Sequence, residues 1–216
     1  MELESNVKKA SEKVEVIEIE QERANHSIWL DKKSFRIALV STFTALAIVL
    51  GYSLYYLPNI ELFTLTIFLS GFILGKRDGM VVGFLSSLIF CFFNPLGASP
   101  LPLLAFQLTH YSLAGLVGAL TMQFLGDRKV LRDKKEYYTI SMMILFGALG
   151  AIITSSFQFL ASLVDVLMSY GTIEAFVPYF FSPTAFPFTV VHIIGNTLGF
   201  IFILPGLIQL INKMLH

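Results

Sequence analysis

Two apolar segments joined by a charged turn restrict what this sequence can fold into more than any other feature. They lie between Glu61 and Gly97, ELFTLTIFLSGFILGKRDGMVVGFLSSLIFCFFNPLG, and the turn is Gly75-Lys76-Arg77-Asp78-Gly79. Each apolar segment approaches the roughly 20 residues that an α-helix needs to cross a bilayer. Lysine and arginine beside a span mark its cytoplasmic side, and glycine lets the backbone turn sharply. The hairpin therefore predicts a helical membrane protein with this turn in the cytoplasm.

The distribution of positive charge extends this prediction to the whole chain. The sequence has 216 residues, of which 55% are hydrophobic, whereas a soluble domain has about 45–50%. Every lysine and arginine lies in one of four places, 1–36, 76–77, 128–135 and Lys213. The intervening polar segments, 57–61, 94–102 and 169–185, contain none. Because basic loops stay in the cytoplasm, the two sets of segments are expected on opposite sides of the membrane.

Threading the chain through a bilayer in this way predicts an all-α membrane protein with six transmembrane helices and both termini cytoplasmic. Residues 1–33 form a polar cytoplasmic N-terminal tail, and residues 34–212 form the six-span membrane domain. The predicted spans are 34–57, 61–74, 80–93, 103–125, 139–168 and 187–210.

Polar side chains inside these spans lie at one common depth, just below the outer surface. Such side chains are costly in a membrane and usually face a cavity or a partner. For His110 and His192, the alternative is that they form hydrogen bonds between helices. For Asp165, the alternative is a position at the water boundary. A pocket open to the outside explains the common depth most simply. The candidate substrate-binding residues are Glu61, Asn94, Gln107, His110, Gln158, Asp165, His192 and Asn196.

The chemistry of these residues limits the ligand and the activity. The outer segments offer no cation to an anionic ligand, so we expect a neutral or cationic one. Abundant phenylalanine and tyrosine suit a flat heterocycle. The chain has no catalytic motif and no phosphate-binding loop, so an enzyme is not expected. The single cysteine, Cys91, excludes a cysteine-based metal site; we expect no metal, no cofactor bound by this chain and no nucleic-acid partner.

Small residues recur at helical spacing in the first predicted span. Ala38 is followed four residues later by Thr42, and Ser41 by Ala45. Small residues four apart let a second helix approach closely. The second helix could belong to this chain or to a partner protein, and the spacing does not distinguish the two.

The central segment resembles the substrate-binding S components of energy-coupling factor (ECF) vitamin transporters. In that family a short turn of the form G-x-x-x-G precedes a G-F-L-S/T-D-like segment and an outer N-P. The counterparts here are Gly75 to Gly79, Gly83-Phe84-Leu85-Ser86-Ser87 and Asn94-Pro95, with Ser87 in place of the aspartate. The family's first helix carries an A-x-x-x-A motif, to which the two small-residue pairs are the nearest counterparts. The resemblance covers roughly residues 35–212.

The resemblance implies a substrate-binding subunit of an ECF-type ABC importer in the plasma membrane. Such a subunit captures a vitamin or precursor from outside, and a riboflavin-like compound is the ligand we expect here. It then associates with a transmembrane coupling subunit, through Ala38, Ser41, Thr42 and Ala45, and with two ATPase subunits that use ATP. A stand-alone secondary transporter or channel for a small solute is the main alternative. A membrane-embedded enzyme would need a cytoplasm-facing cluster of acidic residues or histidines in the spans, which the sequence lacks, and a scaffold leaves the outer polar residues unexplained.

Overall fold

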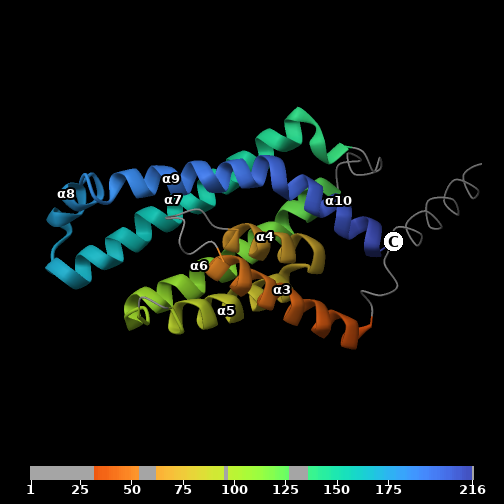
Figure 1. The fold of residues 1–216 in the computed structure, drawn as a ribbon, viewed down its shortest axis with the longest axis horizontal. Helices are drawn as coiled ribbons and strands as arrows, with labels where there is room; N and C mark the ends of the chain where they lie inside the picture. Colours follow the sequence, from red (N-terminus) through yellow and green to blue (C-terminus); the bar gives the residue numbers. More distant parts are fainter. Residues whose placement is uncertain (1–31, 54–61, 95–96, 127–135, 216) are drawn as a thin grey trace, which may run out of the picture.

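The computed structural model describes residues 32–53, 62–94, 97–126 and 136–215, and these residues form helices without any strand. Figure 1 shows their arrangement. The α-helices are α3 (Lys33–Ser53), α4 (Phe63–Leu74), α5 (Lys76–Phe92), α6 (Leu101–Gly126), α7 (Ile140–Tyr170), α8 (Phe176–Phe180), α9 (Phe186–Leu198) and α10 (Leu204–Leu215). Short 3₁₀ turns occupy Glu136–Tyr138 and Ile173–Ala175, and a π-helical turn, η4 (Gly199–Ile203), joins α9 to α10.

Four helical segments are long and apolar enough to cross a membrane. They are α3, α6, α7 and the continuous run Phe186–Ile211. Helix α4 is apolar but has only 12 residues, about 18 Å at 1.5 Å per residue, which is shorter than a hydrocarbon core of about 30 Å. Helix α5 begins with Lys76, Arg77 and Asp78. The prediction of an all-helical protein is confirmed, and four helices of spanning length and composition support a multi-pass membrane protein. The six spans and the cytoplasmic termini stay predictions.

The basic residues that the structure describes all lie at one end of the bundle. They are in the first residues of α3 and α5 and near the end of α10, opposite the end that holds α8 (Figure 1). This segregation agrees with the pattern in the sequence. We call these two ends the basic end and the α8 end.

The hairpin between α4 and α5 is as tight as predicted, but its two glycines, Gly75 and Gly79, have different structural roles. Gly75 alone separates the helices and has a φ of 91°, a conformation that glycine adopts at little cost. Gly79, in contrast, lies inside the first turn of α5. A Cβ there would collide with the backbone of Gly71. Gly79 therefore serves close helix packing rather than the turn.

Glycine contacts also join this hairpin to α6. A Cβ on Gly115 would meet the backbone of Gly79, and one on Gly118 would meet the carbonyl of Phe68. In a bilayer, lipid tails supply no hydrophobic drive, so close backbone approach of this kind holds helices together. Helices α4, α5 and α6 thus form one tightly packed unit.

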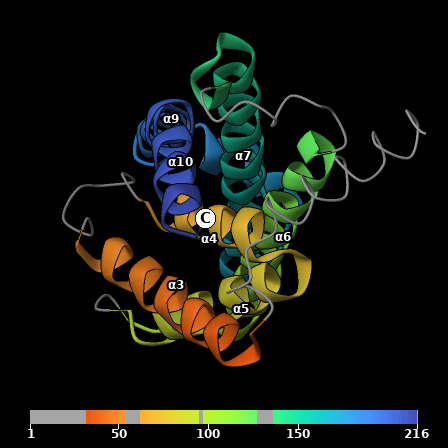
Figure 2. The same ribbon diagram turned by 90° about the vertical axis from the view of Figure 1, so that its right-hand side faces the viewer.

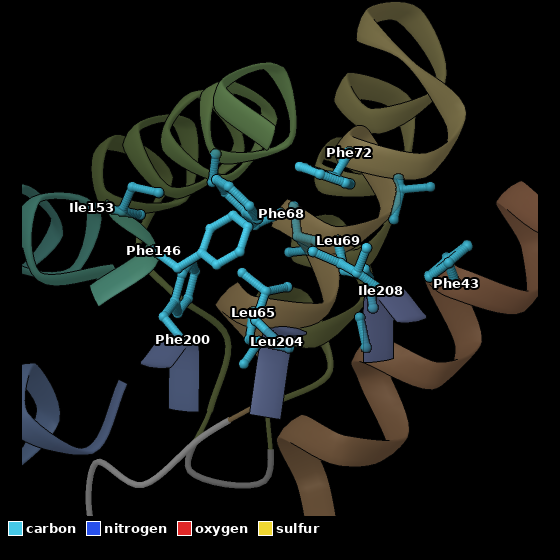
Figure 3. Packing of buried hydrophobic residues seen from close by; sticks show 14 of the residues in the cluster. Phe43, Leu65, Phe68, Leu69, Phe72, Phe146, Ile153, Phe200, Leu204 and Ile208 are labelled. Carbon is cyan, nitrogen blue, oxygen red and sulfur yellow. The ribbon is translucent and has the colours of Figure 1, made fainter. Parts of the chain in front are cut away.

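Helix α4 is the centre of the fold. Eleven of its residues are buried, and α3, α5, α6 and α10 pack around it (Figure 2). Phe68 meets Phe200 edge to face at 5.1 Å between ring centroids, and Phe72 meets Phe146 in the same way at 6.1 Å. These rings and the aliphatic side chains around them form the core seen in Figure 3. Because α4 is covered on every side, its sequence is predominantly apolar on all faces rather than amphipathic.

Helices α7, α9 and α10 form the other part of the bundle. Helix α7 has 31 residues and packs along α9, and the two reach beyond the other helices at the α8 end (Figure 1). The π-turn η4 ends at Ile203, two residues before Pro205. Proline has no N–H and its ring clashes with the carbonyl four residues before it. A widened turn at this position accommodates the proline without ending the helix.

Candidate functional site

Polar and apolar residues are distributed on helix α9 in the reverse of the way they are on a helix of a soluble protein. Its buried residues are all polar, namely Thr189, His192 and Asn196. They are spaced three and four residues apart, so they form one stripe that faces the protein interior. Its exposed large residues are all apolar, namely Phe186, Phe188, Val190, Val191, Ile194 and Leu198. An apolar outer face suits contact with lipid, and a buried polar stripe is a candidate for a functional interior.

The polar stripe of α9 faces a group of rings centred on Phe157 of α7. The ring centroid of Phe157 lies 5.2 Å from that of His110, 5.3 Å from Tyr111 and 5.8 Å from Phe106. His192 approaches the same ring at 6.2 Å with nearly perpendicular planes. We call these five residues the Phe157 cluster. It brings side chains from α6, α7 and α9 to one place.

Amide and hydroxyl groups of α7 and α9 meet beside the Phe157 cluster. The Nδ2 atom of Asn196 donates a hydrogen bond of 3.0 Å to Oγ1 of Thr154. The Nε2 atom of Gln158 is 3.5 Å from Oγ1 of Thr189, at the long limit for a hydrogen bond. Thr154 and Gln158 lie on either side of Phe157 along α7. The predicted residues Gln158, His192 and Asn196 are therefore brought together.

Two amide oxygens in this region are buried and have no hydrogen-bond partner among the described residues. They are Oδ1 of Asn196, whose side chain is only 2% exposed, and Oε1 of Gln107. Gln107 lies on α6, one turn before the His110 and Tyr111 of the cluster. A buried acceptor without a partner costs about 1–3 kcal/mol, and in a native structure it requires an explanation. An N–H or O–H group of a ligand could satisfy such an oxygen.

The aromatic contacts continue from the Phe157 cluster across the bundle. The ring of Tyr111 meets Phe63 of α4 at 4.9 Å, and Phe63 meets Phe90 of α5 at 4.7 Å. Phe90 in turn lies 5.0 Å from Tyr52 of α3. Helices α3, α4 and α5 are thus connected to the cluster through rings.

The remaining predicted site residues lie elsewhere. Asp165 is about two turns beyond Gln158 along α7, towards the α8 end, and it acts electrostatically on Tyr179 of α8. Burial raises the pKa of Tyr179, and the charges of Asp165 and Tyr170 raise it further. Asn94 follows the C-terminal end of α5, where the Tyr52 hydroxyl donates a 3.1 Å hydrogen bond to the carbonyl of Phe93. Glu61 falls outside the described residues.

The sequence did not reveal the aromatic members of the site. Phe106, Tyr111 and Phe157 stand in apolar runs where nothing distinguishes them from core residues. Thr154 and Thr189 could have been identified as site residues from their spacing. Thr189, for example, lies three residues before His192 and so shares its helix face. The structure identifies these residues because it shows which faces of α6, α7 and α9 meet.

Comparisons with protein-family models, with curated proteins and with solved structures gave no match. The function therefore has to be argued from the residues themselves. In the part of the chain that the structure describes, no group of three or more histidine, cysteine, aspartate or glutamate residues could hold a metal ion.

The small residues of α3 divide into two sets. Ala47 and Gly51 are buried, and a Cβ on Gly51 would lie 2.8 Å from the ring of Phe90. The predicted interface residues Ala38, Ser41, Thr42 and Ala45 are instead all exposed. The hydroxyl groups of Ser41 and Thr42 donate to carbonyls of their own helix, at 3.0 Å and 2.9 Å. Packing within the described part of the chain therefore explains only Ala47 and Gly51.

Proposed function

We propose that this chain is a membrane-embedded substrate-binding subunit of an ECF-type ABC importer. It captures a small neutral or cationic heterocycle, such as a vitamin or its precursor, and passes it to partner subunits. The proposal includes six spans in the plasma membrane, with the basic end and both termini in the cytoplasm. The ligand enters from the outside, at the α8 end.

The observation that carries the proposal is the reversed distribution of polar and apolar residues on helix α9. A helix that turns apolar residues outward and buries Thr189, His192 and Asn196 encloses more polar atoms than its hydrogen bonds to α7 use, since Oδ1 of Asn196 has no partner among the described residues. A scaffold would bury apolar residues here, because they pack without hydrogen-bonding requirements. The polar stripe instead provides hydrogen-bonding groups for a molecule bound between α6, α7 and α9.

The groups at the site match a flat heterocycle that donates hydrogen bonds. The oxygens of Gln107 and Asn196 are acceptors, and the ring of Phe157 offers a surface for stacking. No lysine or arginine lies between residues 139 and 212. An anionic ligand would find no fixed positive charge there, whereas a neutral or cationic ring would not need one.

The exposed small residues of α3 supply a surface for the coupling subunit. Ala38, Ser41, Thr42 and Ala45 leave room for a second helix to approach the backbone of α3. The coupling subunit and two ATPases would supply the energy of ATP hydrolysis, for which this chain has no binding loop.

Mass spectrometry of small molecules released from the purified, denatured protein tests the proposal. We expect a heterocycle to be released, and the same compound to raise the melting temperature of ligand-free protein. If nothing is released and no vitamin or precursor changes the melting temperature, the proposal is wrong. Uptake of the compound into vesicles by this chain alone, without ATPases, would instead indicate a secondary transporter.

A pair of neighbouring phenylalanines provides a matched control for the location of the site. Phe157→Leu removes the ring that four members of the cluster contact, so binding should weaken. Phe159→Leu removes a half-exposed ring that contacts α8 instead. Equal loss of binding in both variants would argue against a site at Phe157.

A further inference from the structure

A line of buried residues runs from helix α9, which carries the polar stripe, through the π-turn η4 into α10. An α-helix turns by about 100° per residue, so the sixteen residues from His192 to Ile208 would place these two side chains about 160° apart. A regular helix would therefore turn one end of the line away from the protein interior. The members of the line follow one another at intervals of four residues, and each is at most 5% exposed: His192, Asn196, Phe200, Leu204 and Ile208.

The π-turn η4 keeps both ends of this line on the buried side. In it the backbone N–H of Leu204 donates to the carbonyl of Gly199, five residues earlier, whereas an α-helix joins residues four apart. The turn thus takes up roughly one extra residue, which reduces the angle between His192 and Ile208 by about 100°. Helix α9 can then bury its polar stripe against α7 while α10 buries Leu204 and Ile208 in the core.

Two side chains hold η4 in this widened form. Pro205 has no N–H, and in a regular α-helix its ring would clash with the carbonyl of Ile201. The hydroxyl of Tyr138, in the 3₁₀ turn before α7, donates a 3.1 Å hydrogen bond to the carbonyl of Phe202 inside η4. A Cβ on Gly206 would lie 2.7 Å from the same hydroxyl, so the glycine leaves the room that Tyr138 occupies. Pro205 thus disfavours the regular helix, and Tyr138 stabilises the widened one.

We propose that Tyr138 and Pro205 are positioning residues of the candidate site, because they hold the π-turn that sets the rotation of α9. Both lie towards the basic end of the bundle, beyond η4 from the Phe157 cluster. They act on the polar stripe through the backbone of η4. The ligand that the stripe serves belongs to the proposed function, on which this role rests, whereas the rotation of α9 can be measured without any ligand.

Closure of η4 to a regular helix would change which residues of α9 face α7. With α10 held in the core by its own side chains, α9 would rotate by about 100°, or one residue. Ile193 would then take the place of His192, and Thr197 would take the place of Asn196. The stripe would lose its imidazole and its amide, which are the groups that the candidate site offers to a ligand.

Crosslinking of cysteine pairs between α7 and α9 measures this rotation in the full-length protein. Cys91 is the only cysteine, so a Cys91→Ser background allows two thiols to be placed at chosen positions. Thr154→Cys with Asn196→Cys reports the native rotation, because these two side chains are 3.0 Å apart. Thr154→Cys with Thr197→Cys reports the rotated helix. The probe is dibromobimane, which becomes fluorescent when it joins two neighbouring thiols.

The order of the two crosslinking rates distinguishes the native from the rotated helix. With Tyr138 and Pro205 intact, the pair that contains Asn196→Cys should crosslink several-fold faster than the pair that contains Thr197→Cys. Tyr138→Phe together with Pro205→Ala should reverse this order. An unchanged order would show that other contacts set the rotation of α9, and it would overturn the proposal.

Deletion of Phe202 from the Tyr138→Phe, Pro205→Ala variant distinguishes a change in rotation from general damage to the fold. Phe202 is 56% exposed, so its loss removes no core side chain. A regular helix that is one residue shorter gives α9 the same rotation as the native π-turn, so the original order of rates should return. Loss of crosslinking in both pairs without recovery on deletion would mean that Tyr138 and Pro205 only stabilise the fold, which would also overturn the proposal. Failure of the proposed transport function would leave all these rates unchanged, because no ligand is present.

Discussion

The side chain of Asn196 in α9 donates a hydrogen bond to Thr154 in α7 through its nitrogen, while its buried oxygen has no partner among the described residues. The hydrogen bond fixes the orientation of the amide and directs the oxygen away from Thr154. Asn196 lies three residues before the π-turn η4 and holds an acceptor ready inside the bundle. Turns of this kind occur often at functional sites.

Replacement of this amide should affect ligand binding more than folding. Asn196→Leu combined with Thr154→Val removes both partners of their hydrogen bond without removing much volume, and loss of both polar partners can be nearly neutral for stability. We expect the dissociation constant of the ligand to rise about tenfold or more, which corresponds to about 1.4 kcal/mol. Isothermal titration of the released compound measures this change.

The matched control for Asn196 lies on the same helix. Ile194 is exposed on the opposite, apolar face of α9, so Ile194→Ala should leave the dissociation constant unchanged. If Asn196→Leu combined with Thr154→Val binds as tightly as the unmodified protein, the amide oxygen does not contact the ligand.

Contacts between glycines should make the packing of α4, α5 and α6 sensitive to a single methyl group. Gly115→Ala places a Cβ against the backbone of Gly79, which cannot rotate away as a side chain could. Overpacking of this kind costs about 1–3 kcal/mol or more. The melting temperature in detergent should fall clearly, or the folded protein should not accumulate.

Gly126 offers a control on the same helix, since nothing lies within 4 Å of a Cβ built there. Gly126→Ala should leave the melting temperature unchanged or raise it slightly, because alanine favours helices. Equal melting temperatures for the two alanine variants would show that α6 does not pack against α5 at Gly115.

An ion pair attaches the start of α3 to the hairpin. Arg36 donates to Oδ2 of Asp78 at 2.6 Å and 2.9 Å, and also to the carbonyl of Leu74 at 3.2 Å. The Asp78 side chain is 17% exposed and that of Arg36 is 43% exposed, so solvent screens the pair only in part. Asp78→Asn should lower the free energy of unfolding by about 1–2 kcal/mol.

A double-mutant cycle isolates this contact. Arg36→Gln and Asp78→Asn together should cost less than the sum of the two single changes, because either one already breaks the pair. Arg77→Gln, at an exposed position in the same hairpin, should have little effect. Additive effects of the two changes would contradict a direct contact.

Enlarging the exposed small residues of α3 should prevent assembly with the coupling subunit and leave ligand binding intact. Ala38→Leu or Ala45→Leu fills the space through which a coupling subunit would approach, without touching the Phe157 cluster. We expect co-purification with the coupling subunit to be lost while ligand binding persists. Val49→Leu, exposed further along the same helix, should preserve both. Loss of ligand binding in either alanine variant would speak against this separation.

The helical class and the position of most helices could be predicted from hydropathy alone. A helix such as α7 is unmistakable because its apolar run is longer than any strand or soluble helix requires. The turn at Gly75 was predicted correctly for the same local reason, since glycine tolerates its positive φ. The role of Gly79 was not, because it depends on Gly71 and Gly115, which are distant in the sequence.

The sequence by itself determined that this protein is helical, belongs in a membrane and gathers its basic residues at one end. These properties follow from local hydrophobicity and charge, which each segment carries wherever the others lie. Only the tertiary structure decided that Gln158, His192 and Asn196 share one site while Asp165 lies apart, and that Phe157 stands at its centre. The rotation of each helix about its own axis sets these relationships, and that rotation depends on which neighbouring side chains and glycines allow the closest packing.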